Sequence, residues 1–243
     1  MSGIIQSELL KMRHTFSMKL VFTAPLTAAL LGYLLSGSFA QLSTYNWWYT
    51  ILLPVVVAMW AAGMIVREKN TGMQNVVCLP VRFDKIWLGK TLTLAIMLFG
   101  MHLLLWLITT VMGLLAGTAV SPPDGLIGCI LLFLTYLWQI PFIMLLAGFM
   151  GYLPAVFGAA AASVLLSAFG TEKAWFLLNP YAIPARIVCP FFKIHHNGLP
   201  LNNSSPLLFK GPVLPALAVS LLLALLVYLC SSKLFRKGGG GCA

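Results

Sequence analysis

The sequence predicts an all-α membrane protein with six transmembrane helices. Hydrophobic residues make up 60% of its 243 residues and charged residues only 8%, whereas a soluble domain carries about 25% charged residues. The apolar residues also gather in long runs, and roughly 20 such residues span about 30 Å of hydrocarbon. The six predicted spans are residues 20–38, 48–66, 92–117, 126–149, 155–169 and 213–230.

A polar, amphipathic segment at residues 1–19 precedes the first span. Its apolar residues recur at helical spacing with charged residues between them, which is typical of a helix lying along a membrane surface. The apolar residues are Ile5, Leu9, Met12 and Phe16, and the charged residues are Glu8, Lys11 and Arg13. We expect a cytoplasmic interfacial helix here, and a helical extension of the first span is the alternative. Because no clear small-residue cleavage site follows, we interpret the first apolar run as a retained helix.

The second span begins in an aromatic cluster, Tyr45, Trp47, Trp48 and Tyr49. Tyr and Trp are enriched at the membrane–water interface, so the cluster is predicted to mark headgroup level. A ligand-binding aromatic site is the alternative.

The remaining spans carry fewer polar features. His102 is the one ionisable residue well inside a span, and Pro141 predicts a kink in the fourth span. The fifth span is rich in Ala and Gly, and small residues let membrane helices pack closely.

The positions of the basic residues predict the orientation. If the chain crosses the membrane six times, eleven basic residues lie on one side of it: three in the N-terminal segment, five in the 67–91 loop and three in the 231–243 tail. The 39–47 and 118–125 loops, on the other side, hold none. The positive-inside rule then places both termini in the cytoplasm. The net charge of +10 is explained by contact with anionic headgroups, so we expect membrane lipid as a partner and no nucleic acid.

Residues 170–212 fit a plain external loop poorly. The segment is apolar, contains four basic residues and is rich in proline. We expect short broken helices at the outer surface, forming an external hairpin whose backbone is satisfied against the other helices.

Motifs for chemistry are missing, so we expect no catalytic residue, metal ligand or cofactor in this chain. Gly89-Lys90-Thr91 matches only the end of a phosphate-binding loop, because Asp84 stands where its first glycine should be. His102 lacks the nucleophile motif of a serine hydrolase, and His195 and His196 are adjacent, so they would not share one helix face. The five cysteines show no CxxC spacing.

The energy for any transport must then come from elsewhere. All five acidic residues fall outside the predicted spans or at their ends, whereas an ion-coupled carrier is expected to place carboxylates inside them. A partner protein is the natural source of energy.

Three segments carry a family resemblance. They are SELLKMRHTFSMKLVFTAPL at residues 7–26, NWWYTILLP at 46–54 and REKNTGMQNVVCLPVRFDKIWLGK at 67–90. Together with the length and the number of spans, they resemble the permease subunits of ABC-2-type (type V-like) exporters. The first two segments narrow the resemblance to the lantibiotic-immunity branch.

The resemblance implies a permease that removes a lantibiotic from the plasma membrane of a Gram-positive bacterium. It implies an ABC ATPase subunit, in two copies, that binds ATP and Mg²⁺, and a second homologous permease or a second copy of this chain. The residues expected to couple to the ATPase are Glu8, Lys11, Arg13, Arg67, Glu68, Gly72, Pro80, Arg82 and Asp84. An apolar substrate cleft is expected at Trp47, Trp48, Phe99 and Trp106. Lys85 and Lys90 are expected only to anchor the loop.

Three alternatives remain open at this point. One is an ABC-2 permease for a lipid, a drug or sodium. Another is an intramembrane enzyme using His102, and the last is a structural or sensor protein that works without a transporter. The C-terminal GGGGCA matches nothing in the family.

Overall fold

The computed structural model describes residues 1–13, 15–72, 81–202 and 204–239. This part of the chain is helical, and six helical stretches are long and apolar enough to cross a membrane. They are Phe16–Ser36, Ala40–Asn70, Phe83–Leu115, Pro122–Met150, Tyr152–Gly170 and Val213–Phe235. The predicted fold class is confirmed, and most of the helices extend beyond the predicted spans.

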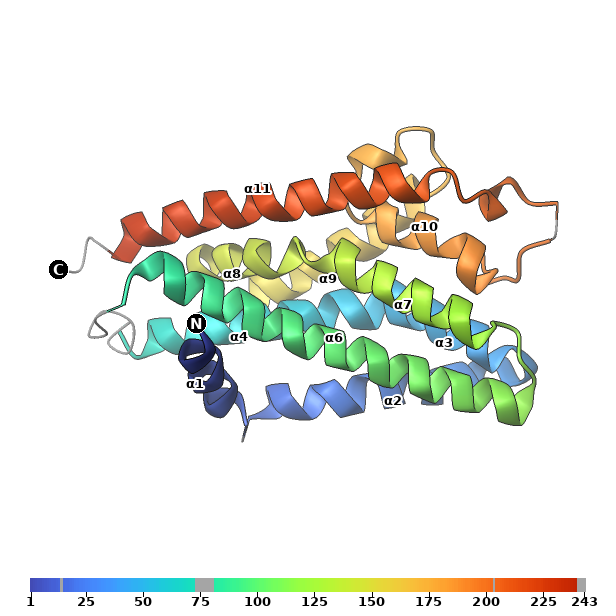
Figure 1. Cartoon of the computed structure of the whole chain (residues 1–243), viewed down its shortest axis with the longest axis horizontal. Helices are drawn as coiled ribbons and strands as arrows, with labels where there is room; N and C mark the ends of the chain where they lie inside the picture. Colours follow the sequence, from blue (N-terminus) through green and yellow to red (C-terminus); the bar gives the residue numbers. More distant parts are fainter. Residues whose placement is uncertain (14, 73–80, 203, 240–243) are drawn as a thin grey trace.

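The N-terminal segment forms two helices rather than one. Helix α1 (Ser2–Met12) lies across one end of the bundle, and α2 (Phe16–Ser36) runs along it (Figure 1). Thr15 between them is extended, with φ −98° and ψ 161°. Phe16 therefore belongs to α2 and is exposed, so the expectation that it continues the apolar face of α1 is wrong. The bundle end that holds α1 is called the α1 end below.

The second crossing is a continuous but irregular helical stretch. It consists of α3 (Ala40–Trp47), the π-helical turn η2 (Trp48–Leu52) and α4 (Leu53–Asn70). Pro54 has no backbone N–H to donate to the preceding turn, which accounts for the wider turn before it.

The prediction of a loop at residues 39–47 is wrong, because residues 40–47 form the buried helix α3, which packs against α2. The chain instead turns at η1 (Gly37–Phe39), where Gly37 has a φ of +49°. The polar side chains of α3 find buried partners: Gln41 accepts from the backbone N–H groups of Ala119 and Val120, both at 2.9 Å. Those partners satisfy the buried amide, so the stretch can pack inside the protein.

The third and fourth crossings are α6 (Phe83–Ala116), followed by α7 (Pro122–Tyr136) and α8 (Gln139–Met150). The break between α7 and α8 lies one turn before Pro141, where the kink was predicted. Because α4 continues to Asn70 and α6 begins at Phe83, the predicted 67–91 loop is helical at both ends, and its expected bounds are wrong.

The last crossings are α9 (Tyr152–Gly170) and α11 (Val213–Gly239), joined by η3 (Phe176–Leu178), α10 (Ala182–Phe192) and η4 (Pro206–Leu208). Every residue of α10 except Arg186 is buried, and α10 packs against α7 and α9. The expected surface hairpin is thus, in its described residues, a single buried α-helix between two 3₁₀ turns. Helix α11 also continues through residues 231–239, where a tail was expected.

The two ends of the bundle differ in content (Figure 1). The α1 end holds α1, the end of α4, the start of α6 and the end of α11. The segment around α10 lies toward the opposite end, called the α10 end below.

Candidate functional site

A buried network of four charged side chains joins three helices at the α1 end. The Lys90 ammonium of α6 donates to Glu8 Oε2 of α1 and to Glu68 Oε1 of α4, both at 2.9 Å. Lys11 of α1 donates to Glu8 Oε1 at 2.8 Å and to Glu68 Oε1 at 3.0 Å. The two carboxylates and two ammonium groups balance in charge, and together they connect α1 to both membrane-spanning helices.

The depth of the network makes the pairing necessary. The Lys90 side chain is 0% exposed, and those of Glu8 and Glu68 are 6% and 7% exposed. An isolated charge at such depth would carry a large desolvation cost, which only close opposite charges and hydrogen bonds offset. The four side chains are therefore expected to act as one unit.

Local sequence places each member. Glu8 and Met12 are one turn apart on the buried face of α1, and Glu68 lies in the last turn of α4. Gly89 of α6 lets α1 approach closely, because a Cβ at this position would collide with the Ile4 side chain.

Lys11 is the network member nearest to solvent. Its partial burial lowers the pKa, but the hydrogen bonds and negative charges of Glu8 and Glu68 outweigh this effect, and the pKa of Lys11 is raised above its usual value of 10.5. Lys11 is therefore a cation at all physiological pH values.

A cavity of about 280 Å³ opens beside the network, lined by residues of α1 and of the end of α4. The lining residues are Glu8, Lys11, Met12, Met64, Arg67, Glu68 and Thr71. Glu68 Oε2 is buried and has no hydrogen-bond partner among the described atoms. This oxygen becomes available to a donor group from outside the chain only when the side chains around it move.

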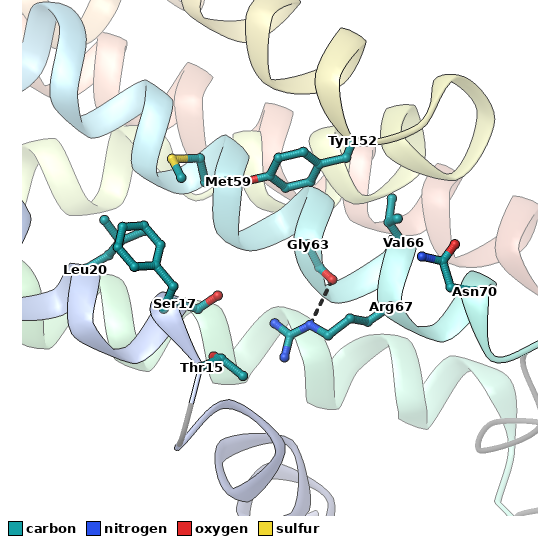
Figure 2. A pocket seen from close by; sticks show the side chains of 10 residues that line it. Thr15, Ser17, Leu20, Met59, Gly63, Val66, Arg67, Asn70 and Tyr152 are labelled. Carbon is teal, nitrogen blue, oxygen red and sulfur yellow. Dashed lines mark hydrogen bonds between the residues drawn. The ribbon is translucent and has the colours of Figure 1, made fainter.

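A second cavity, of about 350 Å³, lies nearby between the start of α2, the end of α4 and the start of α9 (Figure 2). Its walls are largely apolar, with Leu20 and Met59 among them, and Arg67 extends along it. The Arg67 Nε donates to the Gly63 carbonyl at 3.2 Å. Arg67 lines both cavities, so one side chain connects the two depressions.

The structure brings together three of the predicted coupling residues, Glu8, Lys11 and Glu68, and places Arg67 beside them. Gly72 has a φ of +63° directly after α4, a conformation that glycine adopts at little cost. Arg13 is exposed, and Arg82 pairs with Asp84 at 2.8 Å at the start of α6. Pro80 lies outside the described residues.

The expectation that Lys90 only anchors the loop is wrong. Lys90 lies at the centre of the network, whereas Lys85, one and a half turns earlier, is exposed. The sequence held a signal for this difference, because Trp87, Lys90 and Leu94 follow one another at helical spacing on a buried stripe. A lysine on an apolar stripe requires an acidic partner.

The residues predicted to form a substrate cleft are dispersed. Trp48 is fully buried, and its Nε1 donates to His102 Nε2 at 3.5 Å. Trp106 Nε1 donates to the Pro122 carbonyl at 2.9 Å. Only Phe99 among the four is clearly exposed, at 41%, and Trp47 is partly buried. Trp48 is thus a packing residue in this conformation.

The family model described as ABC-2 family transporter protein matches residues 4–171. This range covers more than two thirds of the chain and includes α1 to α9, with the whole charged network. Among curated proteins and among solved structures, none matches this chain.

Proposed function

The chain belongs to the ABC-2 family of transporter proteins and is a permease subunit of an ABC exporter, and we propose that it removes a lantibiotic from the cell membrane. A permease of this family is the membrane component of a transporter and is not itself catalytic. Such permeases generally work with an ABC ATPase subunit. Which ATPase it is, how many copies bind, and what cargo is moved belong to the proposal.

The proposed ATPase docking surface is the α1 end. The observation that carries this proposal is the buried network of Glu8, Lys11, Glu68 and Lys90, which connects α1 to α4 and α6. A helix that lies across the membrane face and is tied to two spans can pass a push on itself to both of them. Two ATPase copies, holding ATP and Mg²⁺ between them, would push α1 in each of two permeases when they close.

The cavities at the α1 end give the ATPase a place to engage. When the side chains around it move, the unpartnered Glu68 Oε2 accepts a hydrogen bond from a donor side chain that enters the smaller cavity. Arg67, which extends along the larger cavity, offers donors to a carboxylate on the same partner (Figure 2).

This assignment makes the α1 end cytoplasmic. Charge supports it, since Lys11, Arg13, Arg67 and Lys69 lie there with Arg82 and Lys85, as the positive-inside rule requires. The start of α1 and the end of α11 lie at this same end (Figure 1), which supports the proposal that both termini face the cytoplasm. A Gram-positive host belongs to the proposal through the family resemblance alone.

The lantibiotic cargo rests on the resemblance at residues 7–26 and 46–54. A lantibiotic is cationic and embedded in the membrane, so an apolar cleft between two permeases suits it better than a polar pore. The exposed Phe99, packed edge to face against Phe133 at 5.2 Å, gives such a cleft an aromatic wall on α6. The second permease is a homologue or a second copy of this chain.

The intramembrane-enzyme alternative finds little support at His102. Its Nε2 accepts from Trp48, and its Nδ1 lies 2.9 Å from the Leu98 carbonyl. Because both ring nitrogens are engaged in hydrogen bonds, the histidine has no free nitrogen for general-base chemistry.

A survival assay tests the proposal. The permease and the ATPase that co-purifies with it are expressed in a lantibiotic-sensitive Gram-positive strain, and the inhibitory concentration is measured for a panel of lantibiotics, drugs and sodium. Protection against a lantibiotic, lost in Glu68→Gln but kept in Lys85→Gln, is expected. Protection only against a drug or sodium would reassign the cargo, and the absence of any co-purifying ATPase would contradict the coupling mechanism.

A further inference from the structure

We propose that Glu172, His195 and His196 form a Zn²⁺ site at the α10 end. His195 Nε2 lies 2.6 Å and His196 Nδ1 3.3 Å from Glu172 Oε1. One ligand atom from each of the three residues lies within 4.8 Å of the other two. The adjacent histidines converge because they lie on a loop after α10 and not on a helix, so the expectation drawn from helix faces does not apply to them.

The loop that carries the two histidines is held in place. An isolated bridge pairs Ile194 with Pro200, and the His195 N–H donates to the Leu199 carbonyl at 2.8 Å. The Gly198 N–H donates back to the His195 carbonyl at 2.9 Å. These bonds close a tight turn, so the backbone that carries the two imidazoles is held in place before an ion binds.

Glu172 is held from the other side. It follows Thr171, which is fully buried and donates its hydroxyl to the Ser167 carbonyl at 2.6 Å, at the end of α9. The three ligands thus come from two segments more than twenty residues apart, and an ion bound by them would connect the end of α9 to the loop after α10.

One of the ligand atoms lacks a hydrogen-bond partner. His196 Nδ1 is buried and makes no hydrogen bond with the described atoms, although Glu172 lies near it. A metal ion would satisfy this nitrogen. Its distance to Glu172 equals the roughly 3.3 Å that separates two ligands bonded at about 2.0 Å in a tetrahedral site.

The ligand types favour Zn²⁺ over Mg²⁺ and Ca²⁺. Two imidazoles and one carboxylate are a frequent set for a zinc site that keeps one position open, whereas Mg²⁺ and Ca²⁺ prefer oxygen ligands. His195 also lines a cavity of about 420 Å³. The Glu172 side chain is half-exposed, so an ion can reach the carboxylate from solvent.

Zn²⁺ binding requires a change of tautomer at His195. The Asn197 N–H donates to His195 Nδ1 at 3.3 Å, so the proton of the neutral ring lies on Nε2 and points to Glu172. Zn²⁺ at Nε2 requires the proton to move to Nδ1, and this long hydrogen bond is lost. Lys173 and Lys193 are neighbours along the chain, but both are exposed and screened by solvent.

Titration calorimetry with ZnCl₂ tests the site. The full chain is purified in detergent without a polyhistidine tag, and wild type is compared with His196→Ala, Glu172→Gln and the control His14→Ala. We expect one Zn²⁺ per chain in wild type and control, binding weakened at least about tenfold in the two site variants, and no binding of Mg²⁺.

The outcome that overturns the proposal is the absence of saturable Zn²⁺ binding to wild type, or wild-type affinity in both site variants. Because Glu172 is half-exposed, with 52% of its side chain accessible, Glu172→Gln is expected to fold even if His196→Ala does not. The measurement needs no ATPase, so its result is independent of the proposed transport function.

Discussion

The two ends of the bundle hold their peripheral helices by different forces. At the α1 end, α1 buries Glu8 and Met12 and is attached to the spans by ion pairs through Lys90 and Lys11. At the α10 end, α10 is buried on nearly all sides by apolar contacts, and its Phe192 stacks on Tyr45 with ring centroids 3.9 Å apart.

This difference matters for function. Apolar packing is non-directional, whereas a buried ion pair depends on the geometry of its partners and leaves an uncompensated charge when one of them is withdrawn. An element that must respond to a partner is better attached by charges, and an element that must stay in place is better attached by packing. We therefore expect α1 to move and α10 to remain fixed during transport.

Lys90→Met should give the largest effect. The substitution removes the fully buried cation and leaves Glu8 and Glu68, among the described residues, with Lys11 as their remaining cation, which should destabilise the protein by about 3–5 kcal/mol. Thermal unfolding in detergent measures the change. Lys85→Met removes an exposed lysine from the same helix and should unfold as wild type does. Equal effects of the two substitutions would show that the network does not hold α1.

Gly128→Ala tests the apolar packing at the α10 end. Gly128 of α7 faces the Phe192 ring, and an added Cβ would collide with it. Overpacking of this kind costs about 1–3 kcal/mol, and the loss should appear in thermal unfolding. The control is Gly100→Ala on α6, where an added Cβ meets nothing within 4 Å. Wild-type stability of Gly128→Ala would mean that α10 is not closely packed.

Some parts of the fold can be predicted from the sequence and others cannot, because different forces hold them. The six spans are predictable because lipid imposes one rule, a long apolar run, on every crossing. Residues 40–47 break that rule, because the partners of Gln41 lie at residues 109, 119 and 120. No local pattern can indicate contacts so distant along the chain.

The candidate site shows the same division. Glu8, Lys11 and Glu68 are predicted to couple to an ATPase because the family resemblance singles out the segments that hold them. The role of Lys90 is harder to predict, because it follows the charges of the loop, and its place on an apolar stripe with Trp87 is the one local sign of burial. Adjacent histidines such as His195 and His196 would diverge on a helix, and it is the loop geometry that brings them to Glu172.

Gly89→Ala disturbs the docking of α1 without removing a charge, so it separates the position of α1 from the charge of the network. The new Cβ collides with Ile4, near the start of α1. The end of a helix can shift more easily than its middle, so the loss of stability should be small, about 1 kcal/mol. The informative measurement is permease-dependent stimulation of the ATPase, which should fall. The Gly100→Ala control should keep full stimulation, and equal stimulation in both variants would argue against α1 as the moving element.

Lys11→Met should have the smallest effect and tests the solvent-facing side of the network. The Lys11 side chain is 39% exposed, so its ion pairs are screened and should contribute less than about 1 kcal/mol. Because the pKa of Lys11 is raised in the folded protein, this contribution is fully present below the unfolded value of about 10.5. It is lost as the pH rises through the higher folded value. The stability difference between wild type and Lys11→Met, measured by chemical denaturation from pH 8 to 11.5, should therefore be constant at first and then shrink. A difference that grows with pH would have the wrong sign for a lysine held by two carboxylates, and would place Lys11 outside the network that attaches α1.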